Sequence, residues 1–232
     1  MKDSGYYNLH DAISHNIIKV QHRIAMACDR SCRSVSDIRI VAISKNFPVS
    51  AIRMAYECGL RDFGENRVQE ASKKFQELTD MGLQIDWHLV GHLQTNKVKN
   101  ALEIFNIIQS VDSLKLAQCI NDCATKKVPI LIQVNISGEE TKYGFSDKDI
   151  IPAIKVIQKL RNININGLMT IAPLVANQED VRHVFRKLSQ LNTSLGFKEL
   201  SMGMTDDFEV AIEEGATSIR IGRAIFGERR FI

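Results

Sequence analysis

The sequence predicts a single α/β barrel, built from eight parallel β/α units and preceded by one extra helix. Short apolar runs of strand length alternate with helical segments eight times along the chain, a pattern typical of parallel β/α units. The length of 232 residues suits one such barrel, because single α/β barrels of about 200–250 residues are common. An open doubly wound sheet often carries a G-x-G-x-x-G loop after its first strand, and Asn46-Phe47-Pro48 stands there instead.

The extra helix is predicted over residues 6–33, where apolar residues recur at helical spacing. The first strand is predicted over 38–45, an apolar run that ends on Lys45. The helix that follows begins near Ser50 and ends before Gly59. Glycine is the residue that most easily adopts the left-handed conformation found just after many helices.

Seven further strands and six further helices complete the pattern. The strands are predicted at residues 61–66, 85–91, 107–111, 129–136, 163–171, 200–203 and 218–222. The helices are predicted in the segment that ends near residue 78, within 95–103, and at 113–126, 147–160, 179–195 and 206–214. Eight such units close naturally into a TIM barrel. No Gly/Ser-rich linker divides them, so residues 1–232 are predicted to form one domain.

Composition and charge exclude several classes of protein. There are 30 Lys and Arg against 27 Asp and Glu, and 44% of the residues are hydrophobic. These values do not fit a disordered chain or a basic nucleic-acid-binding arm. A transmembrane helix needs about 18 consecutive apolar residues, and the sequence has no such run. We therefore expect neither a nucleic acid nor a membrane as partner.

Cysteine usage points to the cytoplasm and to free thiols. The chain has five cysteines, an odd number, and no apolar secretory segment follows Met1, as expected in a reducing compartment. Two pairs, Cys28 with Cys32 and Cys119 with Cys123, are four residues apart. Such pairs can bind a metal only with further His or Cys ligands nearby, and the sequence offers none. No metal site is expected.

Barrel enzymes and binding proteins carry their sites at the carboxyl ends of the strands, and Lys45 is the first candidate there. It ends a strongly apolar strand, so burial at the barrel mouth would favour its neutral amine. A neutral amine is the form that condenses with an aldehyde to a Schiff base. The alternative is a lysine whose ammonium merely reaches solvent from a strand end.

A second candidate site follows strands seven and eight. It comprises residues 201–206 together with Gly222 and Arg223. Barrels often bind phosphate at this place through backbone N–H groups, and Gly203 and Gly222 would let the backbone approach an anion closely. The alternatives are structural, with Thr205 or Asp206 capping the next helix and Gly222 making only a tight turn.

Arg220 is the third candidate. The alternation in residues 218–222 places Arg220 on the opposite face of the strand from Ile219 and Ile221. Its side chain is therefore predicted to enter the barrel, where it either contacts a ligand or forms a buried ion pair with an acidic residue such as Glu65.

A fourth segment, residues 87–97, contains His88 and His92. Two histidines four residues apart suit a metal only on a helix, and this segment starts on a strand. We predict that it forms polar lining of the barrel mouth, with Thr95 or Asn96 as a cap of the next helix.

Together, several of these segments resemble a known family. The chain is similar to the YggS/PROSC family of pyridoxal phosphate homeostasis proteins from near residue 38 onward. The matching segments, in family order, are 41–45, 61–66, 87–97, 142–144, 167–170, 201–207 and 220–227.

The resemblance implies a fold-type III pyridoxal-phosphate barrel, like the barrel half of alanine racemase. It implies that Lys45 holds pyridoxal 5′-phosphate as a Schiff base. It also implies that Arg220 faces the pyridine nitrogen and that Asn66 and Met204 lie near the cofactor.

The phosphate of the cofactor would lie against Ser201, Gly203, Gly222 and the backbone around them. The residue after Gly222 departs from the family pattern, because a hydroxyl residue is usual there and Arg223 takes its place. Arg223 could pair with the phosphate or point to solvent. Two other departures are Asn46-Phe47-Pro48 after Lys45 and Arg67 after Asn66.

Two of these implications bear on catalysis. An arginine opposite the pyridine nitrogen disfavours its protonation, because two positive groups would face each other, and the ring is then a weak electron sink. Racemases of this type take a second proton acceptor from a second domain, and we expect no room for one here because strand eight ends ten residues before Ile232. The prediction is a carrier without robust catalysis and without a catalytic residue; the alternative is a pyridoxal-phosphate-dependent amino-acid enzyme such as a racemase.

The expected partners follow from this hypothesis. They are pyridoxal phosphate itself and apo forms of pyridoxal-phosphate-dependent enzymes as its recipients. The nearly balanced charge and the expected lack of a second domain favour a monomer.

Overall fold

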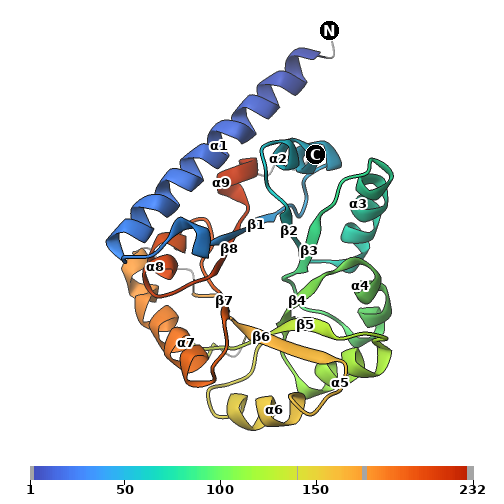
Figure 1. Cartoon of the computed structure of the whole chain (residues 1–232), viewed down its shortest axis with the longest axis vertical. Helices are drawn as coiled ribbons and strands as arrows, with labels where there is room; N and C mark the ends of the chain where they lie inside the picture. The colour runs from blue at the N-terminus through green and yellow to red at the C-terminus, as the bar shows by residue number, and fades with distance from the viewer. Residues whose placement is uncertain (1–2, 140, 174–176, 229–232) are drawn as a thin grey trace.

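The structure, a computed structural model, describes residues 3–139, 141–173 and 177–228. Eight parallel strands follow one another around a closed barrel in chain order, and the last pairs with the first (Figure 1). The strands are β1 (Arg39–Ile43), β2 (Asp62–Glu65), β3 (Asp86–Leu89), β4 (Ile107–Val111), β5 (Val128–Gln133), β6 (Ile163–Met169), β7 (Glu199–Ser201) and β8 (Ser218–Ile221). The predicted fold class is confirmed.

Helices surround the barrel and alternate with the strands (Figure 1). The α-helices are α1 (Asp3–Arg30), α2 (Val49–Glu57), α3 (Val68–Asp80), α4 (Val98–Ile104), α5 (Leu114–Cys123), α6 (Ile150–Ile157), α7 (Arg182–Ser194), α8 (Phe208–Glu213) and α9 (Arg223–Phe226). Short 3-10 helices occupy Val35–Asp37 (η1), Thr95–Lys97 (η2) and Gln178–Val181 (η3). Gly59 follows α2 with φ +97°, as its predicted role requires. The sequence did not predict α9, because four residues carry too little periodicity.

Most of the hydrophobic core lies between the strands and the surrounding helices. Two small apolar clusters are separate from it. One comprises Val41, Ile43 and Val90, and the other Ile107, Leu131 and Met169. Side chains alternate between the two faces of a strand, so these clusters fill the barrel interior together with buried polar residues. The interior is therefore packed rather than hollow, and a ligand can enter only at an end.

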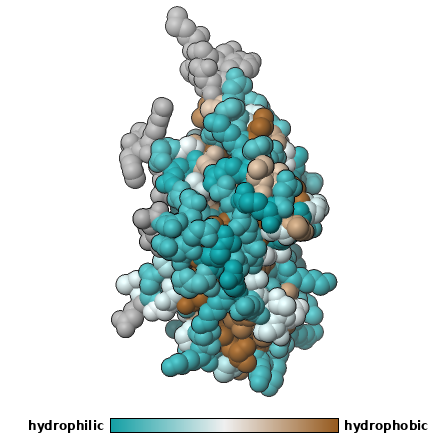
Figure 2. All heavy atoms as spheres, turned by 90° about the vertical axis from the view of Figure 1, so that its left-hand side faces the viewer, coloured by the Kyte–Doolittle hydropathy of each residue, from teal (hydrophilic) through white to brown (hydrophobic). Residues whose placement is uncertain are grey.

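Helix α1 lies along the outside of the barrel, against α2, α8 and α9 (Figure 1). The face of the molecule on this side is mostly hydrophilic (Figure 2), and polar contacts join α1 to α8. Arg23 donates to Glu209 through Nε (2.9 Å) and Nη2 (2.7 Å), and its guanidinium lies 4.4 Å from the centroid of the Phe208 ring. Just beyond α1, Arg33 donates from Nη1 to the carbonyl oxygens of Ile212 in α8 and of Ala216 after it.

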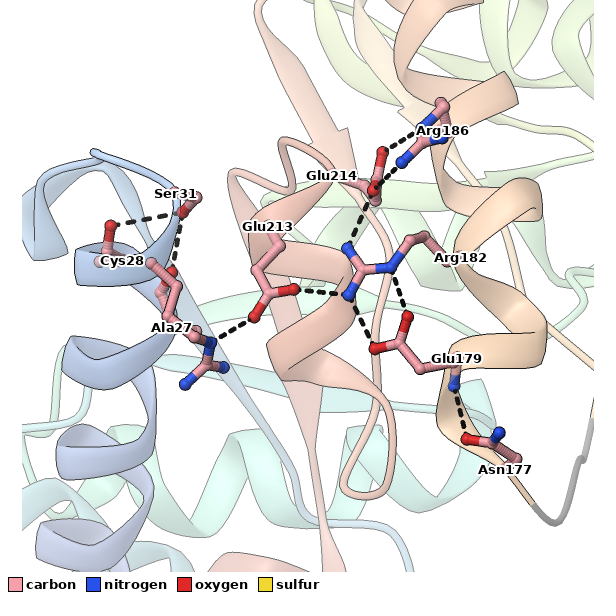
Figure 3. A network of polar contacts seen from close by, with 10 residues as sticks. Ala27, Cys28, Ser31, Asn177, Glu179, Arg182, Arg186, Glu213 and Glu214 are labelled. Carbon is pink, nitrogen blue, oxygen red and sulfur yellow. Dashed lines mark hydrogen bonds and ion pairs between the residues drawn. The ribbon is translucent and has the colours of Figure 1, made fainter.

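Arg182 is the centre of a network that joins α1, α7 and α8 (Figure 3). Its guanidinium donates to three carboxylates, those of Glu179 (2.6 Å), Glu213 (2.6 Å) and Glu214 (3.0 Å). Arg30 of α1 donates to the other oxygen of Glu213 at 2.6 Å. Burial alone would raise the pKa of Glu213, but the hydrogen bonds from Arg182 and Arg30 outweigh it and lower that pKa. A hydrogen bond from Arg182 likewise lowers the pKa of Glu179.

The described part of the chain contains no helix that is long and apolar enough to cross a membrane. The five cysteines are free thiols, as predicted. No group of three or more His, Cys, Asp or Glu residues suited to a metal ion occurs among the described residues.

Replacing Arg182 by Ala should lower the free energy of unfolding at pH 7 by roughly 1–2 kcal/mol, since the network loses three charge-assisted contacts. Carboxylates with lowered pKa stabilise the fold above the unfolded value, near 4.3, and lose that contribution as the pH falls through the folded value. The difference between the two proteins should therefore shrink below about pH 4. Urea unfolding across pH 3–7 measures it, with Arg161→Ala, at an exposed arginine outside this network, as control; a difference that does not depend on pH would contradict the electrostatic explanation.

Candidate functional site

A cavity of about 300 Å³ opens where strands β1 and β8 end. Lys45, two residues beyond β1, and Gly222, directly after β8, line it together with Arg223. The closure of the barrel thus brings together three of the predicted site residues. The other wall residues are Ile43, Phe47, Gly227 and Glu228.

The residues on both sides of Lys45 are held by side chains of strand β2 and helix α3. The Ser44 hydroxyl donates to Glu65 Oε1 at 2.7 Å, and the Ser44 carbonyl accepts from Lys74 Nζ at 2.8 Å. On the other side, the N–H of Asn46 donates to Glu70 Oε1 at 2.6 Å. Asn46 has φ +64°, a conformation that costs free energy for a residue other than glycine unless its surroundings fix it. The segment that presents Lys45 is therefore fixed from the outside of the barrel.

The Lys74 ammonium group joins these contacts. It lies 2.7 Å from Glu65 Oε1 and 2.7 Å from Glu70 Oε1, and both Lys74 and Glu65 are buried. Burial raises the pKa of Glu65, although Lys74 and Ser44 oppose the change. Among the described residues, Glu65 Oε2 has no hydrogen-bond partner. Sequence reasoning did not select Lys74. The available signal was its spacing on the buried face of α3, which also carries Val68, Ala71 and Leu78.

Arg220 enters the barrel, as predicted. Its Nη1 donates to Ser201 Oγ at 2.8 Å and its Nη2 to the carbonyl of Thr170 at 2.7 Å. Both partners are uncharged, and burial lowers the pKa of Arg220 to about 10 despite the opposing charge of Asp207. The alternative ion pair with Glu65 is wrong, because Glu65 faces α3 and pairs with Lys74.

A chain of hydrogen bonds runs from Arg220 through the barrel interior. Ser201 Oγ accepts from Arg220, so its own proton goes to Gln109 Oε1 at 2.7 Å. The Gln109 amide nitrogen then donates to His88 Nδ1 at 2.8 Å. His88 Nε2 in turn carries the proton that faces Asp62 Oδ1 at 3.0 Å. The guanidinium of Arg220, which can only donate, thus sets the direction of every bond in the chain.

The loop between β7 and α8 contains Gly203 and Met204. Gly203 has φ +89°, and a Cβ there would lie 2.6 Å from Ala211 Cβ, so only glycine fits. Its carbonyl accepts from the Arg220 N–H at 3.0 Å, which ties the loop to β8. The Met204 N–H donates to Asp207 Oδ1 at 2.5 Å. Burial raises the pKa of Asp207, with this bond opposing it.

The guanidinium of Arg223 pairs with carboxylates of neighbouring residues. Its Nη2 donates to both carboxylate oxygens of Asp206 at 2.5 Å, and its Nε lies 3.5 Å from Glu228 Oε1. Asp206 therefore serves this ion pair and does not cap α8. The residue that precedes α8 is Asp207, and Thr205 instead accepts from the Ala224 N–H at 3.4 Å. Neither Thr95 nor Asn96 caps α4, which Lys97 precedes without a side-chain hydrogen bond.

Asn66 is not in the wall of the Lys45 cavity; it lines a second cavity, together with His92. His92 Nδ1 lies 2.6 Å from Asp112 Oδ2, and the ring of Tyr143 stacks on the imidazole with 3.9 Å between centroids. Sequence reasoning expected polar lining from this segment but did not connect His92 with Asp112 or Tyr143. No motif spacing joins these three residues, since they follow three different strands.

Comparison with known proteins identifies the family to which this chain belongs. The family model described as "Alanine racemase, N-terminal domain" matches residues 10–230. The pyridoxal phosphate homeostasis protein of Aquifex aeolicus is 44% identical over 222 residues, which span 92% of this chain and 96% of that protein. The chain belongs to the pyridoxal phosphate homeostasis protein family.

Two further proteins show how far the similarity extends. The pyridoxal phosphate homeostasis protein of Pseudomonas aeruginosa is 40% identical over 224 residues, covering 94% of this chain and 96% of that one. The solved structure of PipY from Synechococcus elongatus, with PLP bound, has a TM-score of 0.81 and 36% identity. It covers 93% of this chain and 100% of PipY.

Replacing Lys74 by Met should lower the free energy of unfolding by about 3–5 kcal/mol, because Glu65 would remain buried without its cation. For a chain of this size that corresponds to a Tm lower by about 6–20 °C. Without Lys74, a protonated Glu65 can remain buried at little cost, whereas an ionised Glu65 cannot. The stability difference between Lys74→Met and the wild-type protein should therefore grow as the pH rises through the raised pKa of Glu65.

Thermal unfolding at pH 5 and pH 8 measures this effect. Lys73→Met, at the exposed neighbouring position, is the matched control. Adding Glu65→Gln to Lys74→Met should recover part of the loss. A double variant no more stable than Lys74→Met would show that the buried charge is not the cause.

Proposed function

We propose that this protein holds pyridoxal 5′-phosphate through the ε-amino group of Lys45 and serves as a carrier of that cofactor in pyridoxal phosphate and amino-acid homeostasis. The family names of its relatives and the PLP-bound structure of PipY support the ligand. Pyridoxal phosphate supplies an aldehyde that forms a Schiff base with an amine, and a pyridine ring that withdraws electrons when protonated.

The residues present fit this group. The cavity beside Lys45, at about 300 Å³, lies at the lower end of the range for small-molecule sites. Gly222 places bare backbone in its wall, where even a Cβ would stand 3.4 Å from the Ile43 carbonyl oxygen. Backbone of this kind can approach a phosphate closely. Arg223 adds positive charge at the same wall.

Each predicted site residue has a part in the proposal. Lys45 would bind the aldehyde, and Gly222 with the Gly203 loop would hold the phosphate. The guanidinium of Arg223, which also pairs with Asp206, would partly neutralise the negative charge of the phosphate. Asn66 and Met204 would lie at the border of the site.

Ser201 takes part through its neighbours in the barrel. Its hydroxyl is completely buried and bonded to Arg220 and Gln109. In the proposal, that hydroxyl holds the guanidinium of Arg220, and backbone groups near Ser201 contact the phosphate.

The observation that carries the carrier function is Arg220. Its guanidinium is buried and bonded to uncharged groups, Ser201 Oγ and the Thr170 carbonyl. A cation fixed in this way would discourage protonation of a pyridine nitrogen beside it. A carboxylate in its place would promote protonation and thereby carbanion chemistry on an amino acid. The site therefore suits storage of the aldehyde better than turnover.

The proposal includes a monomer that works in the cytoplasm. Five free cysteines support a reducing compartment. Light scattering coupled to size-exclusion chromatography tests the monomer, and a dimer mass would contradict it.

Lys45→Ala should abolish the violet absorbance that the wild-type protein acquires with pyridoxal phosphate. Borohydride reduction of the wild-type complex, followed by peptide mass spectrometry, should place the reduced adduct on Lys45. Lys127→Ala, at an exposed lysine, is the control and should retain both signals. An unchanged spectrum in Lys45→Ala, or an adduct mainly on another lysine, would refute the assignment.

Incubation of the loaded protein with a panel of L- and D-amino acids separates a carrier from an enzyme. We expect no product beyond one equivalent per protein for any of them, because Arg220 leaves the ring a weak electron sink. Chiral chromatography measures racemisation and keto-acid assays measure transamination. Repeated turnover of any amino acid, lost in Lys45→Ala, would favour a racemase or a related enzyme.

A further inference from the structure

A second cavity, of about 490 Å³, opens at the carboxyl ends of strands β2 and β3. Its wall combines two cations with amide and imidazole groups, and none of the residues in this wall carries a carboxylate. The residues that can contact a ligand through polar side chains are Asn66, Arg67, Gln69, His92, Gln94 and Lys97. No residue is shared with the wall of the Lys45 cavity.

Neither Arg67 nor Lys97 forms a salt bridge in the part of the chain that the structure describes. The charge of Arg67 contributes to lowering the pKa of Glu70, but Glu70 Oε1 accepts its hydrogen bonds from Lys74 and from the Asn46 N–H. The cavity against α8 provides a contrast, since its cations Arg30 and Arg182 are matched there by Glu213. The cavity at β2 and β3 therefore has positive charge that the protein itself does not neutralise.

His92 is fixed in this wall from two sides. Its Nδ1 lies 2.6 Å from Asp112 Oδ2, and the side chain of Asp112 is only 6% exposed. Tyr143 stacks on the imidazole with an interplanar angle of 12°. Because the carboxylate of Asp112 takes the proton on Nδ1, the opposite ring nitrogen, Nε2, is the one left for a ligand. A ring held this way is suited to a hydroxyl group of a ligand.

We propose that this cavity is a non-covalent binding site for a small phosphate monoester that carries a hydroxyl group. Arg67 and Lys97 bind the phosphate, since paired cations recognise it through charge-assisted hydrogen bonds. The amide of Gln94 and the imidazole of His92 bind the hydroxylated body of the ligand. The volume of about 490 Å³ accommodates a molecule of this size and exceeds what a bare phosphate ion needs.

Titration of the ¹⁵N-labelled full chain with glycerol 3-phosphate tests the proposal by amide chemical shifts. We expect saturable shifts in residues 66–69 and 92–97. Arg67→Gln and Lys97→Gln should each weaken this binding by about tenfold or more, as expected for loss of a charge-assisted contact. Lys73→Gln and Lys99→Gln, at exposed positions outside this wall, are the matched controls and should leave the affinity within about twofold.

Two further probes define the ligand class and the place of binding. Succinate, which has the charge but no phosphate, should bind at least about tenfold more weakly than glycerol 3-phosphate. The shifts at residues 66–69 should persist in Lys45→Ala, which separates this site from the proposed function. Shifts confined to the surroundings of Gly222, equal weakening by the controls, or equal binding of succinate would each overturn the proposal.

Discussion

Pairing of β1 with β8 is the constraint on which the site depends. Four registered residue pairs, from Arg39 with Ser218 to Ala42 with Ile221, close the barrel between segments 179 residues apart in the chain. Only this closure places Lys45 in one wall with Gly222 and Arg223. Because all strands are parallel, their carboxyl ends lie at the same mouth of the barrel, and residues that follow different strands can line one site.

The barrel interior also holds the guanidinium of Arg220 without a carboxylate in direct contact with it. Arg220 is buried among acceptors that carry no charge, and the chain through Ser201, Gln109 and His88 reaches a carboxylate only at Asp62. A carboxylate directly beside the guanidinium would cancel its effect on a ligand. Outside the barrel the opposite arrangement occurs, since Lys74 lies directly between carboxylates and fixes the backbone around Lys45. The same fold thus has one buried cation that contacts uncharged acceptors and another that is paired with carboxylates. In the proposed function the first acts on the ring nitrogen and the second fixes the backbone at Lys45.

The sequence predicted the strands well because their apolar runs are dense, and strand ends pointed to Lys45, Arg220 and Gly222 without any structure. It predicted partners poorly. Glu65 was a plausible partner for Arg220 by charge alone, but alternation along β2 directs it to α3, whereas Asp62 faces the interior. Contacts such as His92 with Asp112 join residues on different strands and leave no local pattern. The family resemblance supplied expected roles for the site residues, and the structure added how Ser201 and Lys74 support them.

The most direct test of the account is transfer of the cofactor from the loaded protein to an apo form of a pyridoxal-phosphate-dependent enzyme. The protein is first loaded, freed of unbound cofactor by gel filtration, and mixed with the apo-enzyme, whose recovered activity is followed over time. A carrier predicts recovery up to one equivalent of cofactor per loaded protein, with no recovery from Lys45→Ala treated in the same way. An apo-enzyme that stays inactive with the loaded protein, yet recovers with free pyridoxal phosphate, would contradict the account.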